Sequence, residues 1–185
     1  MDNKGKLTGI PVNYRNFILT YSNNPEDHGW KREDVEYLLN CIKNDCLDPS
    51  EFSSGESDLY DDIGCLFEDG VCVQPDINAA VYWYEKAIEL DNDLARSNLA
   101  DILRKGSQGY PKDLKRAFEL YKACGLPYAH YRCGEFYEKG WGVEKDLDKA
   151  KTYYMLAYKE GHPLAKKKRA EWDFVNEDLS ALSER

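Results

Sequence analysis

The sequence contains no long apolar run, and the longest strongly apolar stretch near its N-terminus is Phe17-Ile18-Leu19. A membrane-spanning helix needs about 20 consecutive apolar residues, and the apolar core of a secretory signal peptide needs about 7–15. We therefore expect no membrane partner and a cytoplasmic location. Runs of Val, Ile and Thr, which would indicate strands, are nearly absent, so the sequence favours an all-α fold.

Basic charge is in deficit, because 25 Lys and Arg stand against 34 Asp and Glu. Nucleic-acid binding depends on Lys and Arg that neutralise phosphates, so we expect no nucleic-acid partner. The acidity is concentrated: residues 58–94 carry ten acidic residues and one basic residue, Lys86, whereas residues 95–128 carry seven basic and three acidic ones. A protein with a basic surface is the natural complement of the acidic segment.

Histidine is scarce as well, and His28, His130 and His162 are far apart in the sequence. They form no His-x-x-x-His pair, and the six cysteines lack the two close pairs of a zinc site. We expect no metal and no cofactor. In a reducing compartment the cysteines are free, mostly buried thiols, with a link between Cys65 and Cys72 as the alternative.

Internal repetition is what the sequence does have. Segments that begin at Leu59, Ala95 and Ala129 repeat one pattern, and a fourth begins at Ala165 and stops early. The matching columns hold a small residue (Gly64, Ala100, Gly134, Ala170), a large apolar or aromatic residue (Phe67, Leu103, Tyr137), a glycine (Gly70, Gly106, Gly140), an aspartate (Asp76, Asp113, Asp146), an alanine (Ala80, Ala117, Ala150) and a tyrosine (Tyr84, Tyr121, Tyr154).

Each column has a structural role. The glycine supplies the positive φ that ends a helix, and the aspartate accepts hydrogen bonds from the free N–H groups of the next helix. The small residue allows a neighbouring helix to approach closely, while the alanine and tyrosine share one helix face. Each unit is therefore a helix, a glycine loop and a second helix. Such short helices must stack to bury their apolar faces.

Residues 129–161 follow the pattern most fully and resemble the Sel-one-like repeat, a relative of the tetratricopeptide repeat with a longer glycine loop. The matching residues are Gly134, Tyr137, Gly140, Gly142, Val143, Asp146, Lys149, Ala150, Tyr153 and Tyr154. The resemblance covers about residues 58–173. It implies an α/α solenoid of about three repeats that acts as a scaffold for protein–protein contacts and has no shared active site. Two departures are Cys72, where the second loop glycine is expected, and an inserted residue before Asp113.

The two ends of the chain do not fit the repeat. We expect residues 1–57 to form an N-terminal helical cap and linker, residues 58–174 the repeat domain with a C-terminal capping helix, and residues 175–185 a flexible tail. A separate partner-binding element is the alternative for the first segment. Two amphipathic helices are predicted within it from apolar spacing. The first contains Tyr14, Phe17, Ile18 and Tyr21, and the second contains Val35, Leu38, Leu39 and Ile42.

An enzyme is a further alternative, because some cysteine-rich secreted relatives are associated with β-lactam binding or hydrolysis. A serine β-lactamase needs a Ser-x-x-Lys pair and a Lys-Thr-Gly strand. No serine here has a lysine three residues on, and Lys151-Thr152 continues with Tyr153. Of the two cysteines that form the disulfide in those relatives, Cys124 matches one, but His130 stands at the other position. We therefore predict a protein without enzymatic activity.

In tetratricopeptide-like stacks the first helix of each unit lines the concave face. Once the core columns are removed, the candidate partner-binding residues on these helices are Asp61, Asp62, Glu68, Asp69, Asn98, Asp101, Tyr131, Arg132 and Glu135. They predict an acidic groove that becomes mixed in sign toward the C-terminus, and a merely solvated helix face is the alternative. Trp141 is a second candidate, because tryptophan is enriched at interface hot spots. Packing over its own loop is the alternative for Trp141.

Together these features predict a non-enzymatic protein–protein interaction module that binds a basic protein partner. Its most concrete form is a bacterial immunity protein that neutralises a cationic toxin. A general adaptor in signalling or host interaction is one alternative. An enzyme acting on β-lactams or the cell wall is the second.

Overall fold

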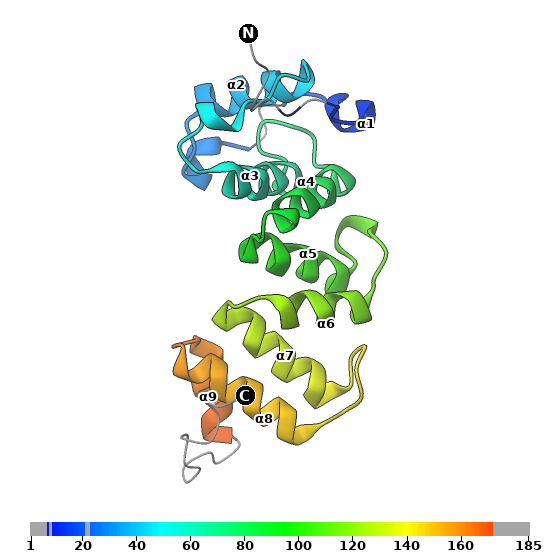
Figure 1. Cartoon of the computed structure of the whole chain (residues 1–185), viewed down its shortest axis with the longest axis vertical. Coiled ribbons are helices and arrows are strands. Elements are labelled where there is room, and N and C mark those ends of the chain that lie inside the picture. Colours follow the sequence, from blue (N-terminus) through cyan, green and yellow to red (C-terminus); the bar gives the residue numbers. More distant parts are fainter. Residues whose placement is uncertain (1–6, 8, 21–22, 172–185) are drawn as a thin grey trace. The chain divides into compact units, whose positions relative to one another are not determined.

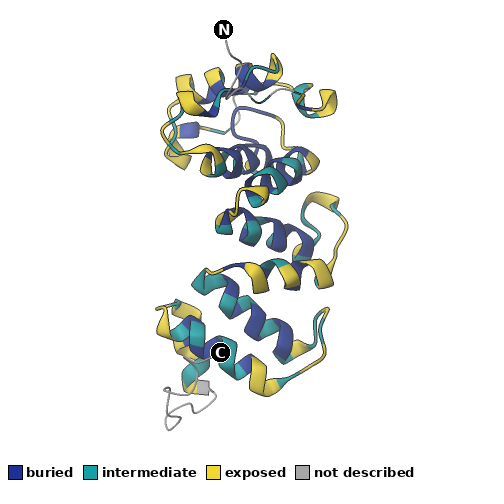
Figure 2. Cartoon of the chain, in the orientation of Figure 1, coloured by how far each residue is buried: buried dark blue, intermediate teal, exposed yellow. Residues whose placement is uncertain are grey.

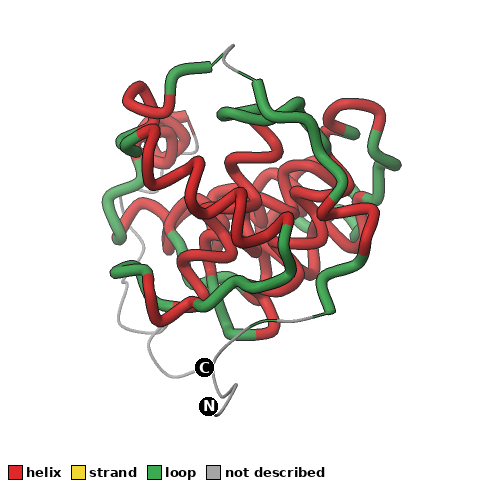
Figure 3. Tube along the Cα trace, turned by 90° about the horizontal axis from the view of Figure 1, so that it is seen from above, coloured by secondary structure: helices red, strands yellow, loops and turns green. Residues whose placement is uncertain are grey.

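The computed structural model describes residues 7, 9–20 and 23–171. In this part of the chain there are nine α-helices, short 3₁₀ turns and two isolated β-bridges, without a strand (Figure 1). The helices are α1 (Val12–Arg15), α2 (Arg32–Lys43), α3 (Glu56–Asp69), α4 (Ile77–Glu89), α5 (Asp93–Lys105), α6 (Leu114–Ala123), α7 (Pro127–Lys139), α8 (Leu147–Lys159) and α9 (Pro163–Glu171). Helices and loops alternate along the described chain (Figure 3). The predicted all-α class is confirmed.

The chain divides into two compact units. The first holds the described residues up to Leu99 together with Ser107–Tyr110, and the second holds Ala100–Gly106 and the described residues from Pro111 onward. The division into a cap of residues 1–57 and a repeat domain of residues 58–174 stays a prediction. Within these described residues, none of the helices is both long and apolar enough to cross a membrane.

The aspartate and glycine columns have the predicted local structure. Asp76, Asp113 and Asp146 are the N-cap residues of α4, α6 and α8, and each side chain accepts a hydrogen bond from a backbone N–H two or three residues later. Gly70 and Gly140 end α3 and α7 in the left-handed conformation, with φ of 71° and 70°. The helix–loop–helix units of the sequence pattern are thus confirmed.

The loop residue two positions after the helix-ending glycine has a positive φ in both the first and the third repeat. Gly142 has φ of 64°, and a Cβ there would lie 2.6 Å from backbone atoms of Leu114. Cys72 occupies the equivalent position in the first repeat and adopts the same conformation, with φ of 58°. A cysteine replaces the glycine there and keeps the turn, although its Cβ makes this conformation costly for a non-glycine residue.

The small-residue and tyrosine columns form the contact between the two helices of a repeat. A Cβ added to Gly64 would lie 2.5 Å from the ring of Tyr84, and one added to Gly134 would lie 2.6 Å from the ring of Tyr154. Both rings are almost completely buried, and buried residues line the packed sides of α3 with α4 and of α7 with α8 (Figure 2). The glycines therefore let a tyrosine ring lie directly on the first helix.

The predicted helix through Tyr14, Phe17 and Ile18 is wrong beyond α1. The chain after Arg15 is extended, because its backbone groups pair with the loop of the first repeat: Thr20 N–H donates to Cys72 O at 2.8 Å, and Ile18 O accepts from Gln74 N–H at 3.0 Å. Ile18 is 69 % exposed instead of lying on a buried helix face. Tyr21 lies outside the described residues.

The second predicted amphipathic helix is confirmed as α2, which buries Val35, Leu38, Leu39 and Ile42. Residues 48–57, at the end of the predicted cap and linker, contain the 3₁₀ turn Pro49–Glu51 and the first two residues of α3. The predicted capping helix corresponds to α9. Residues 172–174 of that helix and the predicted tail at residues 175–185 lie outside the described residues.

Candidate partner-binding site

The acidic residues of α3 do not form one uniformly exposed face. Asp61 is only 6 % exposed, and its carboxylate accepts a hydrogen bond from the Asn98 side-chain amide at 3.0 Å. Burial raises the pKa of Asp61 to about 6, against the opposing effect of the Asn98 hydrogen bond. The neighbouring carboxylates of Asp62, Asp58 and Glu68 raise it further. Asp61 therefore belongs partly to the interior of the first unit.

Asp62 is half-buried and faces outward. Burial raises its pKa to about 6, and the nearby Asp58 carboxylate adds to the effect. Among the residues that the structure describes, no side chain forms a hydrogen bond or ion pair with its carboxylate. A half-buried carboxylate that forms no ion pair gains the most from an incoming positive charge.

The last turn of α3 holds one engaged and one exposed acid. Glu68 accepts a hydrogen bond from the Tyr84 hydroxyl at 2.8 Å, so it helps to join α3 to α4. The Asp69 side chain is 54 % exposed, and its carboxylate lies 3.8 Å from Nδ1 of His28. The four acids predicted on this helix thus divide into an inward pair, Asp61 and Glu68, and an outward pair, Asp62 and Asp69.

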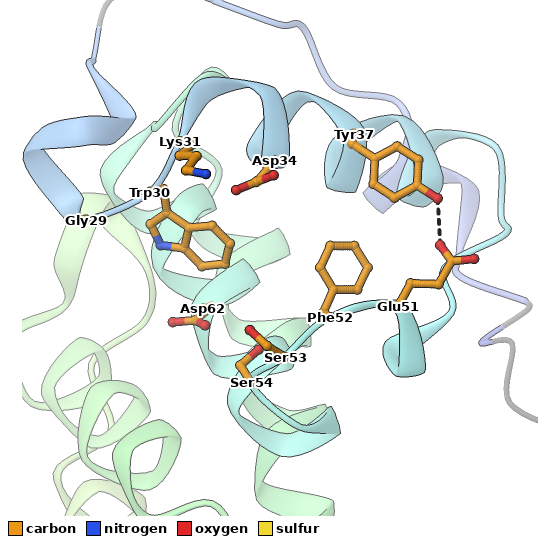
Figure 4. A pocket seen from close by; sticks show the side chains of 10 residues that line it. All are labelled: Gly29, Trp30, Lys31, Asp34, Tyr37, Glu51, Phe52, Ser53, Ser54 and Asp62. Carbon is orange, nitrogen blue, oxygen red and sulfur yellow. Dashed lines mark hydrogen bonds between the residues drawn. The ribbon is translucent and has the colours of Figure 1, made fainter.

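A pocket of about 520 Å³ opens beside Asp62 in the first unit. Its other lining residues come from the segment before α2, from α2 itself and from the turn before α3: Gly29, Trp30, Lys31, Asp34, Tyr37, Glu51, Phe52, Ser53 and Ser54 (Figure 4). A second hollow of about 240 Å³ shares Trp30 and Asp62 with the pocket and also includes His28 and Asp69. Three aromatic side chains and several carboxylates thus surround one concave region.

Sequence reasoning identified only Asp62 among the residues that line the larger pocket. Trp30 carried a usable signal, because it directly follows Gly29 in a segment that separates two apolar patterns. Trp141 was identified from the same kind of signal, a tryptophan beside loop glycines. Tyr37 and Phe52 carried none, because their meeting at 6.2 Å between ring centroids depends on tertiary packing.

In the second unit, the Asp101 carboxylate is the centre of a hydrogen-bond network. Its carboxylate accepts hydrogen bonds from Arg104 at 3.0 Å, Lys105 at 2.9 Å, the Tyr128 hydroxyl at 2.9 Å and the Tyr121 hydroxyl. Burial alone would raise the pKa of Asp101, but the hydrogen bonds from Tyr121, Lys105 and Arg104 outweigh it and hold the pKa at about 2. Asp101 therefore ties α5, α6 and α7 together.

On α7, three of the predicted site residues are buried or half-buried: Tyr131, Arg132 and Glu135. Tyr131 is 7 % exposed and stacks on the ring of His162 at 4.8 Å. Arg132 forms an ion pair with Glu135 at 2.5 Å and lies over the ring of Tyr128 at 4.8 Å. The structure brings these predicted site residues together, and it pairs Arg132 with Glu135 while leaving the buried Nε of Arg132 without a hydrogen-bond partner among the described residues.

Trp141 packs beside its own loop. Its ring meets Phe136 edge-on at 5.7 Å, and the Lys139 ammonium lies 4.5 Å from the ring centroid. The indole is half-buried, so one side of it is covered by the repeat that carries it.

Among the described residues, no group of three or more His, Cys, Asp and Glu side chains is placed to hold a metal ion. All six cysteines are free thiols, and four of them are buried. Cys65 is half-buried and lies 3.4 Å from the Tyr84 hydroxyl.

Comparison with known families finds matches to the model described as Sel1 repeat at residues 61–92, 94–123 and 127–162. A curated relative, Chitin synthase regulatory factor 3 of Schizosaccharomyces pombe, is 34 % identical over 113 residues. The match covers 59 % of this chain but only 11 % of that relative's length.

Solved structures with a similar fold include further Sel1 repeat proteins. A Sel1 repeat protein from Oxalobacter formigenes matches with a TM-score of 0.61 and 27 % identity, covering 76 % of this chain and 99 % of that one. A protective antigen of uropathogenic Escherichia coli with an SLR fold matches with a TM-score of 0.61 and 26 % identity, covering 66 % and 27 %. Cysteine rich protein B of Helicobacter pylori, at 22 % identity and a TM-score of 0.53 over 80 % of this chain and 98 % of that one, is similar in fold alone.

Proposed function

Because the chain belongs to the Sel1 repeat family, whose members generally serve as non-enzymatic protein-interaction modules, we propose that its acidic first unit binds a basic surface of a partner protein. The predicted α/α solenoid of three repeats agrees with this family assignment. Sel1 repeat proteins bind other proteins, and the acidic charge of this chain supports a basic partner.

The observation that carries the proposal is the outward pair of acids on α3. Asp62 is half-buried without a cationic partner among the described residues, and Asp69 is more than half exposed at the end of the same helix. Asp101 in the second unit differs, because its own cations and hydroxyls already satisfy it. Uncompensated negative charge therefore concentrates on the first unit, where it attracts a basic partner and speeds association.

The most concrete form of this function is an immunity protein that covers a cationic toxin in a bacterial cell. Its support is the formal charge of −9 together with a family that generally lacks catalysis. An immunity protein has one dominant partner, and that partner is more basic than the cellular average.

An adaptor is the second candidate function. The name of the matched yeast relative, a regulatory factor, favours this reading. An adaptor holds several different proteins, and their charges need not share one sign.

Affinity capture with the full chain, followed by mass spectrometry, distinguishes the two candidates. A single basic protein that is released by raised salt is expected for the immunity role, because screening weakens exposed charge pairs. Several unrelated partners favour the adaptor. Partners that are acidic, or that stay bound irrespective of salt, contradict the proposal that the acidic unit forms the interface.

A further inference from the structure

A tight backbone turn leads into one side of the pocket beside α2. Gly29 ends the 3₁₀ turn Pro25–His28 with φ of 80°, and Trp30 N–H donates to Pro25 O at 3.0 Å. The chain then enters α2 directly, with Lys31 at the N-cap position. The turn thus places the main chain of Trp30 directly before α2, and its half-buried ring forms one side of the pocket (Figure 4).

The opposite side of the pocket is aromatic as well. Phe52 and Tyr37 lie with ring centroids 6.2 Å apart, and the Tyr37 hydroxyl donates to Glu51 at 2.6 Å. That hydrogen bond orients the Tyr37 ring toward Glu51, and it is the main cause of the raised pKa of the Tyr37 hydroxyl. Figure 4 shows Trp30 and Phe52 on either side of the opening.

Two carboxylates from different helices complete the pocket. Asp34 comes from the first turn of α2 and Asp62 from the middle of α3, and both line the same opening (Figure 4). Among the described residues neither carboxylate forms a hydrogen bond or an ion pair through its side chain. Lys31 is the single cation among the lining residues. The pocket therefore combines aromatic faces with free negative charge.

This combination selects a planar cation. We propose that the pocket bounded by Trp30, Phe52, Asp34 and Asp62, called the Trp30 pocket below, binds an arginine side chain of the partner protein. The inference rests on the proposed function and names the group that anchors the basic partner. A guanidinium stacks on aromatic rings and donates in its plane to carboxylates on both sides, whereas a lysine ammonium is a compact, strongly hydrated charge.

The volume of the pocket agrees with such an anchor. About 520 Å³ lies within the range of pockets that take small ligands, and it leaves room for the arginine and the backbone that carries it. Ser53 and Ser54 also line the pocket, and their hydroxyl groups can accept hydrogen bonds from further N–H groups of the guanidinium (Figure 4). Arginine is also among the residues that most often dominate interface energetics.

The test uses N-acetyl-arginine amide as the probe and the citrulline analogue as its neutral counterpart of the same shape. The indole N–H resonance of Trp30 is followed by NMR in the full chain and is assigned with the Trp30→Phe variant. We expect a saturable shift with the arginine compound and a weaker one with the lysine analogue. Citrulline should produce no saturable shift. Equal shifts with arginine and citrulline, or no shift with either, overturn the proposal.

Variants localise the effect. Asp34→Asn combined with Asp62→Asn should weaken arginine binding at least fivefold. Glu33→Gln combined with Glu26→Gln is the matched control, because it also removes two charges, and both glutamates are exposed and do not line the pocket. Equal weakening by the control and the double variant means general charge attraction and contradicts the pocket. If the double variant does not fold, the arginine and citrulline comparison on the unaltered chain decides the question.

Failure of this inference is separable from failure of the proposed function, because the probe assay needs no partner protein. Arginine binding at Trp30 in a chain that captures no basic protein supports the pocket and contradicts the function. Capture of a basic protein whose affinity is lowered by Asp62→Asn and Asp69→Asn but unchanged by Trp30→Ala and Asp34→Asn supports the function and contradicts the pocket.

Discussion

Removal of the charge at Asp61 should stabilise the protein at neutral pH. Asp61 is 6 % exposed, and burial raises its pKa from 3.8 to about 6. Below pH 3.8 the carboxyl is protonated in both the folded and the unfolded state, so its ionisation costs nothing. Between pH 3.8 and about 6 the unfolded state has released this proton while the folded state still holds it, so stability falls across this range and levels off above it.

The size of the effect follows from the shift. A shift of about two pKa units corresponds to roughly 3 kcal/mol, since each unit is worth about 1.4 kcal/mol. Asparagine at position 61 can still accept the hydrogen bond from Asn98. We expect Asp61→Asn to raise the free energy of unfolding by about 1–3 kcal/mol above pH 6.5 and by less than about 0.5 kcal/mol near pH 4.

Urea unfolding at these two pH values, followed by circular dichroism, measures the difference. Asp148→Asn is the control, because Asp148 is exposed in the first turn of α8. The same stability change for Asp61→Asn at both pH values refutes the burial argument. A loss of stability at neutral pH would show that the Asn98 hydrogen bond requires a carboxylate.

Three further substitutions test the repeat itself by chemical unfolding. Gly142→Ala should lower the free energy of unfolding by about 1–3 kcal/mol, because the new Cβ would lie 2.6 Å from backbone atoms of Leu114. Gly109 is the control, because it also has a positive φ but has open space around it. Gly109→Ala should lower the free energy of unfolding by only about 1 kcal/mol. Equal costs contradict the close approach. Tyr154→Phe should cost about 1–3 kcal/mol, since it removes a hydrogen bond to a charged carboxylate, and a neutral result contradicts this. Asp113→Ala should lower the free energy of unfolding by about 0.5–2 kcal/mol through loss of the α6 N-cap, and unchanged stability would contradict the capping role.

The local structure of the repeat could be predicted from the sequence because single residues determine it. Asp146 caps α8 through its own side chain, and Gly140 ends α7 through its own φ. The extended path after α1 could not be predicted in the same way. The spacing of Tyr14, Phe17 and Ile18 fits a helix, but the backbone pairs with the loop around Cys72, a partner that apolar spacing does not indicate.

The candidate site was harder to predict, because the state of each acid depends on its neighbours in space. Glu68 and Asp101 are both acidic residues on first helices of a repeat, and each accepts a hydrogen bond from the tyrosine of the following helix. Asp62 has no such tyrosine. The repeat pattern identifies the tyrosine column but does not indicate which acid lies within reach of its hydroxyl group, so the sequence could not separate engaged acids from outward ones.

The central claim is that the outward acids of the first unit bind a basic partner. The most direct test measures, by calorimetry, the affinity of the captured partner for the variant with Asp62→Asn and Asp69→Asn. The control variant carries Glu144→Gln and Asp148→Asn, which remove two exposed acids of the second unit. We predict that the first variant raises Kd roughly 3- to 10-fold and that the control changes it less than about twofold. Equal effects of the two variants would contradict the account.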